Sequence, residues 1–212
     1  MGTPPAPSPA RAGEETDGRH ARRAANRAAV VDALLELYRD GVPDPSTNEI
    51  AERAGISPRS LFRYFDDTDD LARAAIEHEY ARARPLLPAR TEPSDDTAVK
   101  IERFVEARWR LWQEIEASAR ASRRRAANNT MIANHLRSAR RFLRGQIREL
   151  FAPELARMDA AEAAAALACA DVLCSFESYE LLRHDQRLSQ ARAASTLRAA
   201  LARLLSPTGT AD

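Results

Sequence analysis

Several residue types that a β-sheet protein would need are scarce in this sequence. Aromatic residues make up 6% of the 212 residues, and there are 7 glycines. β-Branched residues are also few, whereas alanine, arginine and leucine dominate. Because these three favour helices, while β-branched and aromatic residues favour strands, the composition predicts an all-α fold and argues against a β-sandwich or barrel.

Cysteine and histidine are too few and too scattered to predict a disulfide framework or a metal site. The two cysteines, Cys169 and Cys174, would point about 140° apart on a helix and would not pair there. The 4 histidines show no metal-ligand spacing. No nucleophile–base pair or phosphate-binding loop is apparent at a helpful spacing. We therefore expect no metal, no cofactor and no enzymatic activity.

Long apolar runs are missing as well. No stretch of about 18 uncharged apolar residues occurs, so no transmembrane helix is expected. The N-terminus also lacks the apolar segment of a secretory signal. These two observations lead us to expect a cytoplasmic protein without a membrane partner.

Charge is balanced overall but is distributed unevenly along the chain. The formal net charge is +1. Residues 1–85 and 149–212 each have a net charge of −3, whereas residues 98–148 have +9. We interpret the basic segment as a solvated face. Two alternatives stay open: it contacts the acidic turn Asp66–Asp70, or it favours an anionic effector.

Capping residues and prolines divide the chain into short helices followed by longer ones. Four prolines among the first nine residues predict a disordered tail over residues 1–18, and a second tail is expected over 207–212. An Arg-rich connection is expected over 120–129. Apolar spacing and caps predict helices over residues 19–40, 46–54, 57–65, 68–84, 96–119, 130–151 and 159–182, and one from 189 onward.

The segment from Thr47 to Asp66 has the residue pattern of a helix-turn-helix. A small residue, Ala51, stands where the second helix crosses the first, and Gly55 stands at the turn, where a positive φ is needed. The apolar positions that fix the crossing angle are Ile50, Ile56 and Leu61. The pattern predicts a helix-turn-helix DNA-binding domain over residues 19–66. The alternative is an ordinary αα-hairpin within a helical bundle.

A resemblance to TetR-type (tetracycline-repressor-like) regulators is carried by the run A-E-R-A-G-I-S-P-R-S-L-F-R-Y-F-D-D-T-D-D-L, Ala51–Leu71. The run L-L-E-L-Y-R-D-G, Leu34–Gly41, also resembles that family. The motif covers about residues 22–76, and the rest is similar in layout only. The resemblance implies a helical effector-binding and dimerisation domain over residues 67–206, linked to the first domain by the helix from about residue 68.

The resemblance also implies which residues contact DNA. The recognition helix would be Pro58–Tyr64 in the major groove, with Arg59 and Arg63 reaching guanine bases. The full set of implied DNA-binding residues is Thr47, Asn48, Ser57, Pro58, Arg59, Ser60, Phe62, Arg63, Tyr64 and Thr68. Two arginines before the motif, Arg22 and Arg23, either follow the DNA backbone or minor groove or belong to a solvated helix face.

Two departures from the family pattern weaken the expected affinity for DNA. Thr68 stands within an acidic turn, at a position where the family often has a phosphate-binding lysine. Phe62 stands where the family often has a tyrosine. These departures keep an alternative open, namely a helical dimeric interaction module that has lost sequence-specific DNA binding.

The C-terminal helices are expected to form a homodimer and to enclose an effector pocket, as the resemblance implies. The helix over 159–182 is apolar around much of its circumference, which favours cover by a partner subunit over burial within one chain. Candidate pocket residues, for which core packing is the alternative, are Trp109, Trp112, Met131, His135, Phe142, Phe176 and Tyr179.

Together the observations predict a cytoplasmic transcriptional regulator that acts as a repressor. It would bind a palindromic operator in double-stranded DNA as a homodimer formed through its last two long helices. A small-molecule effector that prefers the released state would remove it from the operator.

Overall fold

The computed structural model describes residues 9–87 and 91–206, with side chains described from residue 21 onward. Every regular element in these ranges is helical, so the predicted all-α fold is confirmed. The chain divides into two compact units between His78 and Glu79. Among the described helices, none is both long and apolar enough to cross a membrane.

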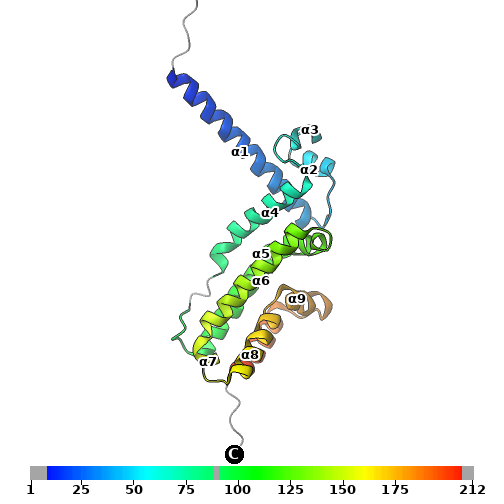
Figure 1. Ribbon diagram of the computed structural model, residues 1–212. Helices are drawn as coiled ribbons and strands as arrows, with labels where there is room; N and C mark the ends of the chain where they lie inside the picture. The colour runs from blue at the N-terminus through cyan, green and yellow to red at the C-terminus, as the bar shows by residue number, and fades with distance from the viewer. Residues whose placement is uncertain (1–8, 88–90, 207–212) are drawn as a thin grey trace, which may run out of the picture. The chain divides into compact units, whose positions relative to one another are not determined.

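The first unit is built from four helices: α1 (Pro9–Arg39), α2 (Thr47–Arg53), α3 (Pro58–Leu61) and the greater part of α4 (Thr68–Ala83). Figure 1 shows α2 and α3 beside the C-terminal half of α1. The apolar side chains of all four helices meet in a small core. Its most buried members include Val30, Leu34, Leu35, Ile50, Leu61, Phe65 and Leu71.

The start of α1 differs from the sequence-based expectation. The helix begins at Pro9, so the predicted disordered tail is wrong for residues 9–18. Proline is tolerated at the first position of a helix, where its missing N–H needs no partner, and the alanine, arginine and glutamate that follow favour a helix. Residues 1–8, and the second predicted tail at 207–212, lie outside the described part of the chain.

The second unit packs its helices around α5 (Thr97–Ala126), which contacts α6 (Thr130–Leu150) and α10 (Gln190–Leu205) extensively. Figure 1 shows α5 and α6 side by side. The remaining elements are α7 (Ala152–Leu155), α8 (Ala160–Leu173), α9 (Phe176–Glu180), a short 3₁₀ helix at Arg84–Leu86 and a π-helix at Leu181–Asp185. Aromatic side chains dominate the core, among them Phe104, Trp109, Trp112, Phe151 and Phe176.

Two predicted helix boundaries are wrong in this unit. Helix α5 does not end at 119 but continues to Ala126, because alanine and arginine are good helix formers. The helix predicted over 159–182 is interrupted after Leu173, where Ser175 accepts a hydrogen bond from the Ser178 backbone N–H and caps a new helix. The candidate pocket and dimer residues of this stretch therefore lie on two separate helices, α8 and α9.

A buried ion pair fixes α7 against the start of α5. Lys100, the single lysine of the chain, is 1% exposed and lies 2.7 Å from a carboxylate oxygen of Glu154. The Thr97 hydroxyl also donates to this carboxylate. Burial raises the pKa of Glu154, but these hydrogen bonds outweigh it, and the pKa lies below its ordinary value of 4.5. The pair therefore stabilises the fold at pH values above 4.5, and this contribution is lost as the pH falls through the lowered pKa of Glu154.

Replacing Lys100 by methionine is expected to lower the free energy of unfolding by about 3–5 kcal/mol, because the Glu154 carboxylate stays buried without its cation. Urea unfolding followed by circular dichroism measures this change. The double variant Lys100→Met, Glu154→Leu leaves no charge and is expected to recover most of the loss. A double variant that is no more stable than the single one would contradict this explanation.

Candidate functional site

The first helix of the predicted motif, α2, is fixed at its start by a capping box. The Ser46 hydroxyl accepts a hydrogen bond from the backbone N–H of Glu49, whose carboxylate accepts from the Ser46 backbone N–H at 2.8 Å. The Ser46 hydroxyl and backbone N–H both hold the pKa of Glu49 below its ordinary range. At the other end, Arg53 pairs with Asp40 at 2.8 Å and ties α2 to the end of α1. The position of α2 is therefore determined at both ends.

The turn between α2 and α3 depends on a glycine in the left-handed region. Gly55 has a φ of +67°, and its backbone N–H donates to the Glu52 carbonyl. The N–H of Ile56 then bonds the Ala51 carbonyl at 2.9 Å. Ala51 is completely buried, which agrees with the expected close crossing of the second helix. These contacts form the predicted helix-turn-helix.

The second helix of the motif is shorter than predicted. Ser57 caps α3 by accepting from the Ser60 backbone N–H, and Pro58 occupies the first turn. The α-helix ends at Leu61, and residues 62–64 continue as turns, in which the N–H groups of Arg63 and Tyr64 bond carbonyls three residues earlier. Such tighter turns are common at helix ends. Leu61 is fully buried, which anchors this segment to the core.

The residues implied in DNA contact form a largely solvent-facing surface around α3. Arg59 and Arg63 are exposed, as is Phe62 with 51% of its surface accessible. Other exposed members are Asn48, Ser57, Pro58 and Thr68 on the motif and Arg22 and Arg23 on α1, whereas Thr47, Ser60 and Tyr64 are partly exposed. The side chains of Arg59 and Arg63 form no ion pair with any described residue. Both guanidinium groups are therefore available to an external partner.

Three side chains of α1 support the segment after α3. Asn26 donates to the Tyr64 hydroxyl at 2.8 Å, and Arg23 donates to the Arg63 carbonyl at 3.3 Å. Arg27 stacks over the Phe65 ring at 4.6 Å. Sequence reasoning missed the roles of Asn26 and Arg27, although their spacing with Arg23 puts all three on one helix face. Arg23 thus has a supporting contact within the unit.

The acidic turn before α4 is partly neutralised within the unit. The Asp67 carboxylate accepts from the Asp70 backbone N–H at 2.7 Å, as a helix N-cap does. Asp70 pairs with Arg73 and lies 3.8 Å from Arg27. Two of the four carboxylates in this turn therefore have partners, which reduces the repulsion that the sequence suggested towards an anionic partner.

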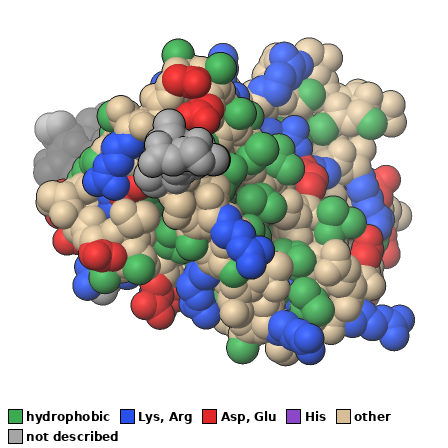
Figure 2. Space-filling model, turned by 90° about the horizontal axis from the view of Figure 1, so that it is seen from below, with side chains coloured by type: hydrophobic (Ala, Val, Ile, Leu, Met, Phe, Trp, Pro, Cys, Tyr) green, Lys and Arg blue, Asp and Glu red, His purple; other side chains and the backbone are tan. Residues whose placement is uncertain are grey.

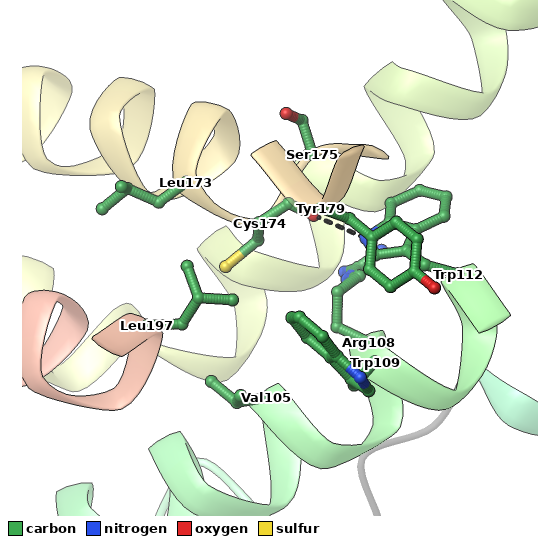
Figure 3. Close-up of a pocket in the computed structure, with 9 residues that line it drawn as sticks. All are labelled: Val105, Arg108, Trp109, Trp112, Leu173, Cys174, Ser175, Tyr179 and Leu197. Atoms are coloured by element: carbon green, nitrogen blue, oxygen red, sulfur yellow. Dashed lines mark hydrogen bonds between the residues drawn. The ribbon is translucent and has the colours of Figure 1, made fainter. Parts of the chain in front are cut away.

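The second unit contains a small enclosed cavity beside α5. Its volume is about 10 Å³, and α5, α10 and the break between α8 and α9 form its walls. Figure 3 shows how side chains from these elements converge, with the Trp112 indole N–H donating to the Cys174 carbonyl at 3.1 Å. The lining residues are Val105, Arg108, Trp109, Trp112, Leu173, Cys174, Ser175, Tyr179 and Leu197.

The predicted pocket residues separate into two groups in the structure. Trp109, Trp112 and Tyr179 line the cavity, and Phe176 packs against Trp112 with ring centroids 5.7 Å apart. The other three lie elsewhere on α6: Phe142 is 45% exposed, His135 contacts the edge of Tyr80, and Met131 is partly buried. Arg108 also lines the cavity and was not among the predicted pocket residues.

The fold and the exposed segment after Gly55 define a helix-turn-helix protein with a larger helical second unit. Residues 30–75 match the family of bacterial regulatory proteins described as the tetR family. The resemblance inferred from the sequence is thus confirmed over these residues. A comparison with curated proteins gave no match.

Solved structures share the fold of most of the chain. A transcriptional regulator from Rhodococcus sp. Rha1 has a TM-score of 0.68 at 17% identity, with 84% of this chain and 95% of that one covered. A protein described as a TetR-family transcriptional regulator from Rhodococcus sp. has a TM-score of 0.66 at 20% identity, with 86% of this chain and 100% of that one covered. The multidrug binding protein EbrR, complexed with imidazole, has a TM-score of 0.55 at 21% identity, with 88% of this chain and 98% of that one covered. The second unit therefore has the fold found in these regulators.

Replacing Gly55 by alanine is expected to lower the free energy of unfolding by about 1–2 kcal/mol, because a Cβ is unfavourable at positive φ even though open space surrounds it. Gly145, inside α6 and equally uncrowded, provides the matched control. Its replacement by alanine is expected to stabilise the protein by up to about 1 kcal/mol. Thermal unfolding compares the two, and equal effects would contradict the role of the left-handed turn.

Proposed function

We propose that the protein is a dimeric transcriptional regulator that represses genes by binding a palindromic operator and is released by a small ligand. The observation that carries this proposal is the pair of exposed, unpartnered arginines, Arg59 and Arg63, presented after the turn at Gly55. A helix-turn-helix reads DNA by inserting its second helix into the major groove. The match of residues 30–75 to the tetR family supports the same function.

Within this proposal the surface residues take two kinds of role. Arg59 and Arg63 lie four positions apart and would donate to guanine O6 and N7, which the major groove exposes. Asn48, at the first turn of α2, would read a further base. Phosphate contacts would come from Thr47, Ser57, Ser60, Tyr64 and Thr68. Arg22 and Arg23 would extend these contacts along the DNA backbone. Pro58 and Phe62 would shape the contact surface.

The dimer would form through α8 and α10. The outward face of α8 consists of small apolar side chains, including Ala161, Ala168 and Val172, and Val172 is 65% exposed. Hydrophobic side chains reach the surface among arginines on the face seen in Figure 2. Two copies of this helix pair would bury these faces in a four-helix bundle, and their two-fold symmetry would suit a palindrome. Small side chains are also exposed on α10, namely Ala191, Ser195, Ala199 and Ala202.

Ligand release would act through the break between α8 and α9. The cavity is walled by Leu173, Cys174 and Ser175, which form this break. A ligand that enlarges the cavity would shift α8 and with it the proposed dimer face. A preference of a few kcal/mol for the shifted state is enough to change the population that is competent to bind DNA.

Replacing Arg59 and Arg63 by alanine is expected to abolish preference for the operator, because each well-placed base contact is worth about 1–3 kcal/mol of discrimination. Gel retardation with the region upstream of the coding sequence, against a scrambled fragment, measures this. The exposed Arg110 on α5 offers a matched control, and its replacement by alanine should leave retardation unchanged.

Selective retardation that survives in the Arg59→Ala, Arg63→Ala variant would contradict the assigned roles. Absence of any retardation by the wild-type protein at low salt would instead favour the alternative of an interaction module without DNA binding.

Substituting Val172 by aspartate is expected to convert the dimer into a monomer of unchanged helix content, because a charge would be buried at the centre of the interface. Sedimentation equilibrium gives the mass, and circular dichroism gives the helix content. Val99, 37% exposed near the start of α5, is the control, and its replacement by aspartate should leave the dimer intact. A Val172→Asp protein that remains dimeric would exclude α8 as the interface.

A further inference from the structure

Arg108 is a buried charge that forms no direct ion pair with any described residue. Its side chain lies on the wall of the cavity, and the residue is only 6% exposed. Among described residues, its Nη1 has no hydrogen-bond partner, and Nη2 has a single long contact of 3.4 Å to the Gln146 side chain. The guanidinium stacks over the rings of Phe104 at 4.9 Å and Trp112 at 5.9 Å. Ring contacts of this kind do not neutralise the charge.

The groups around Arg108 offer it no direct ion pair, and the carboxylate of Asp171 acts on it only at a distance. Burial lowers the pKa of Arg108 only to about 10, so it stays cationic. Burial also raises the pKa of the Cys174 thiol to about 12 and raises that of the Tyr179 phenol, so both remain neutral. Asp171 interacts electrostatically with Arg108 but forms no ion pair with it within the described chain. An unpaired buried cation is costly, and an external anion would relieve that cost.

The cavity combines this cation with apolar walls. Val105, Leu173 and Leu197 face it together with the tryptophan rings, as Figure 3 shows. A second buried donor on the wall, the Trp109 indole Nε1, also lacks an acceptor among the described residues. The residues of the wall thus include two buried N–H donors without acceptors and one formal charge, whereas the surface that faces the cavity is almost entirely carbon. Its chemical complement is an acceptor with one negative charge and an apolar body.

We propose that this cavity binds a monoanionic carboxylate with an apolar body, whose carboxylate pairs with Arg108. The proposal names the effector class, and in that respect it rests on the proposed function. A phosphate dianion fits less well, because one buried guanidinium balances one negative charge. The present volume of about 10 Å³ holds about one water molecule, so binding must enlarge the cavity. The break after Leu173 provides a wall that is not part of a continuous helix.

Tryptophan fluorescence tests the proposal directly. The chain has two tryptophans, Trp109 and Trp112, and both line the cavity. Titration of the full-length protein with sodium phenylacetate or octanoate is expected to give a saturable change in emission. Phenylacetamide, which has nearly the same shape as phenylacetate but no charge, is expected to bind at least about 30-fold more weakly, the effect of losing one buried charge pair.

Two variants complete the test. Arg108→Met is expected to remain folded and to bind phenylacetate at least about 30-fold more weakly. Arg108→Gln serves the same purpose should the first variant lose its helix content. Arg110→Met, on the exposed side of the same helix, is expected to bind like the wild type.

Equal binding of acid and amide, binding that survives in both Arg108 variants, or no change in emission with either acid would overturn the proposal. None of these results depends on DNA. Retardation of the operator without carboxylate binding would refute only the effector class, whereas carboxylate binding without retardation would refute only the gene-control function.

Discussion

The left-handed turn at Gly55 is the constraint on which the exposed surface of the first unit depends. Its φ of +67° reverses the chain within one residue, and the complete burial of Ala51 lets the following segment cross α2 closely. With Leu61 fixed in the core, Arg59 and Arg63 are directed to solvent. A larger side chain at Ala51 would push the two segments apart, and a Cβ at Gly55 would disfavour the left-handed turn. Either change would disturb the presentation of the two arginines.

The second unit has an equivalent constraint in the break between α8 and α9. Helix α8 ends at its C-cap, Cys174, and Ser175 caps the start of α9. The residues at this break also form one wall of the cavity that Arg108 lines. The proposed dimer face lies on α8, immediately before the break. The cavity, the buried cation and the proposed dimer face are thus connected through a few residues, which would give the proposed ligand a short physical route to the proposed dimer.

The helix-turn-helix could be predicted because its signals are local. The Ser46–Glu49 capping box, Gly55 and the Ser57–Pro58 start each act within a few residues, and all are present in the structure. Features that depend on tertiary contacts were missed. The partner of Lys100 lies 54 residues away, and the isolation of Arg108 is visible only once its surroundings are folded. Three predicted pocket residues on helix α6 lie away from the cavity, namely Met131, His135 and Phe142. Sequence spacing alone does not reveal this.

We propose that two helix-turn-helix units, related by two-fold symmetry, read DNA together. Hydroxyl-radical footprinting of the fragment upstream of the coding sequence shows where the protein contacts DNA. We expect two protected segments related by two-fold symmetry, with centres about 10 base pairs or one further turn apart. Protection that is uniform along the fragment, or absent at low salt, would contradict it.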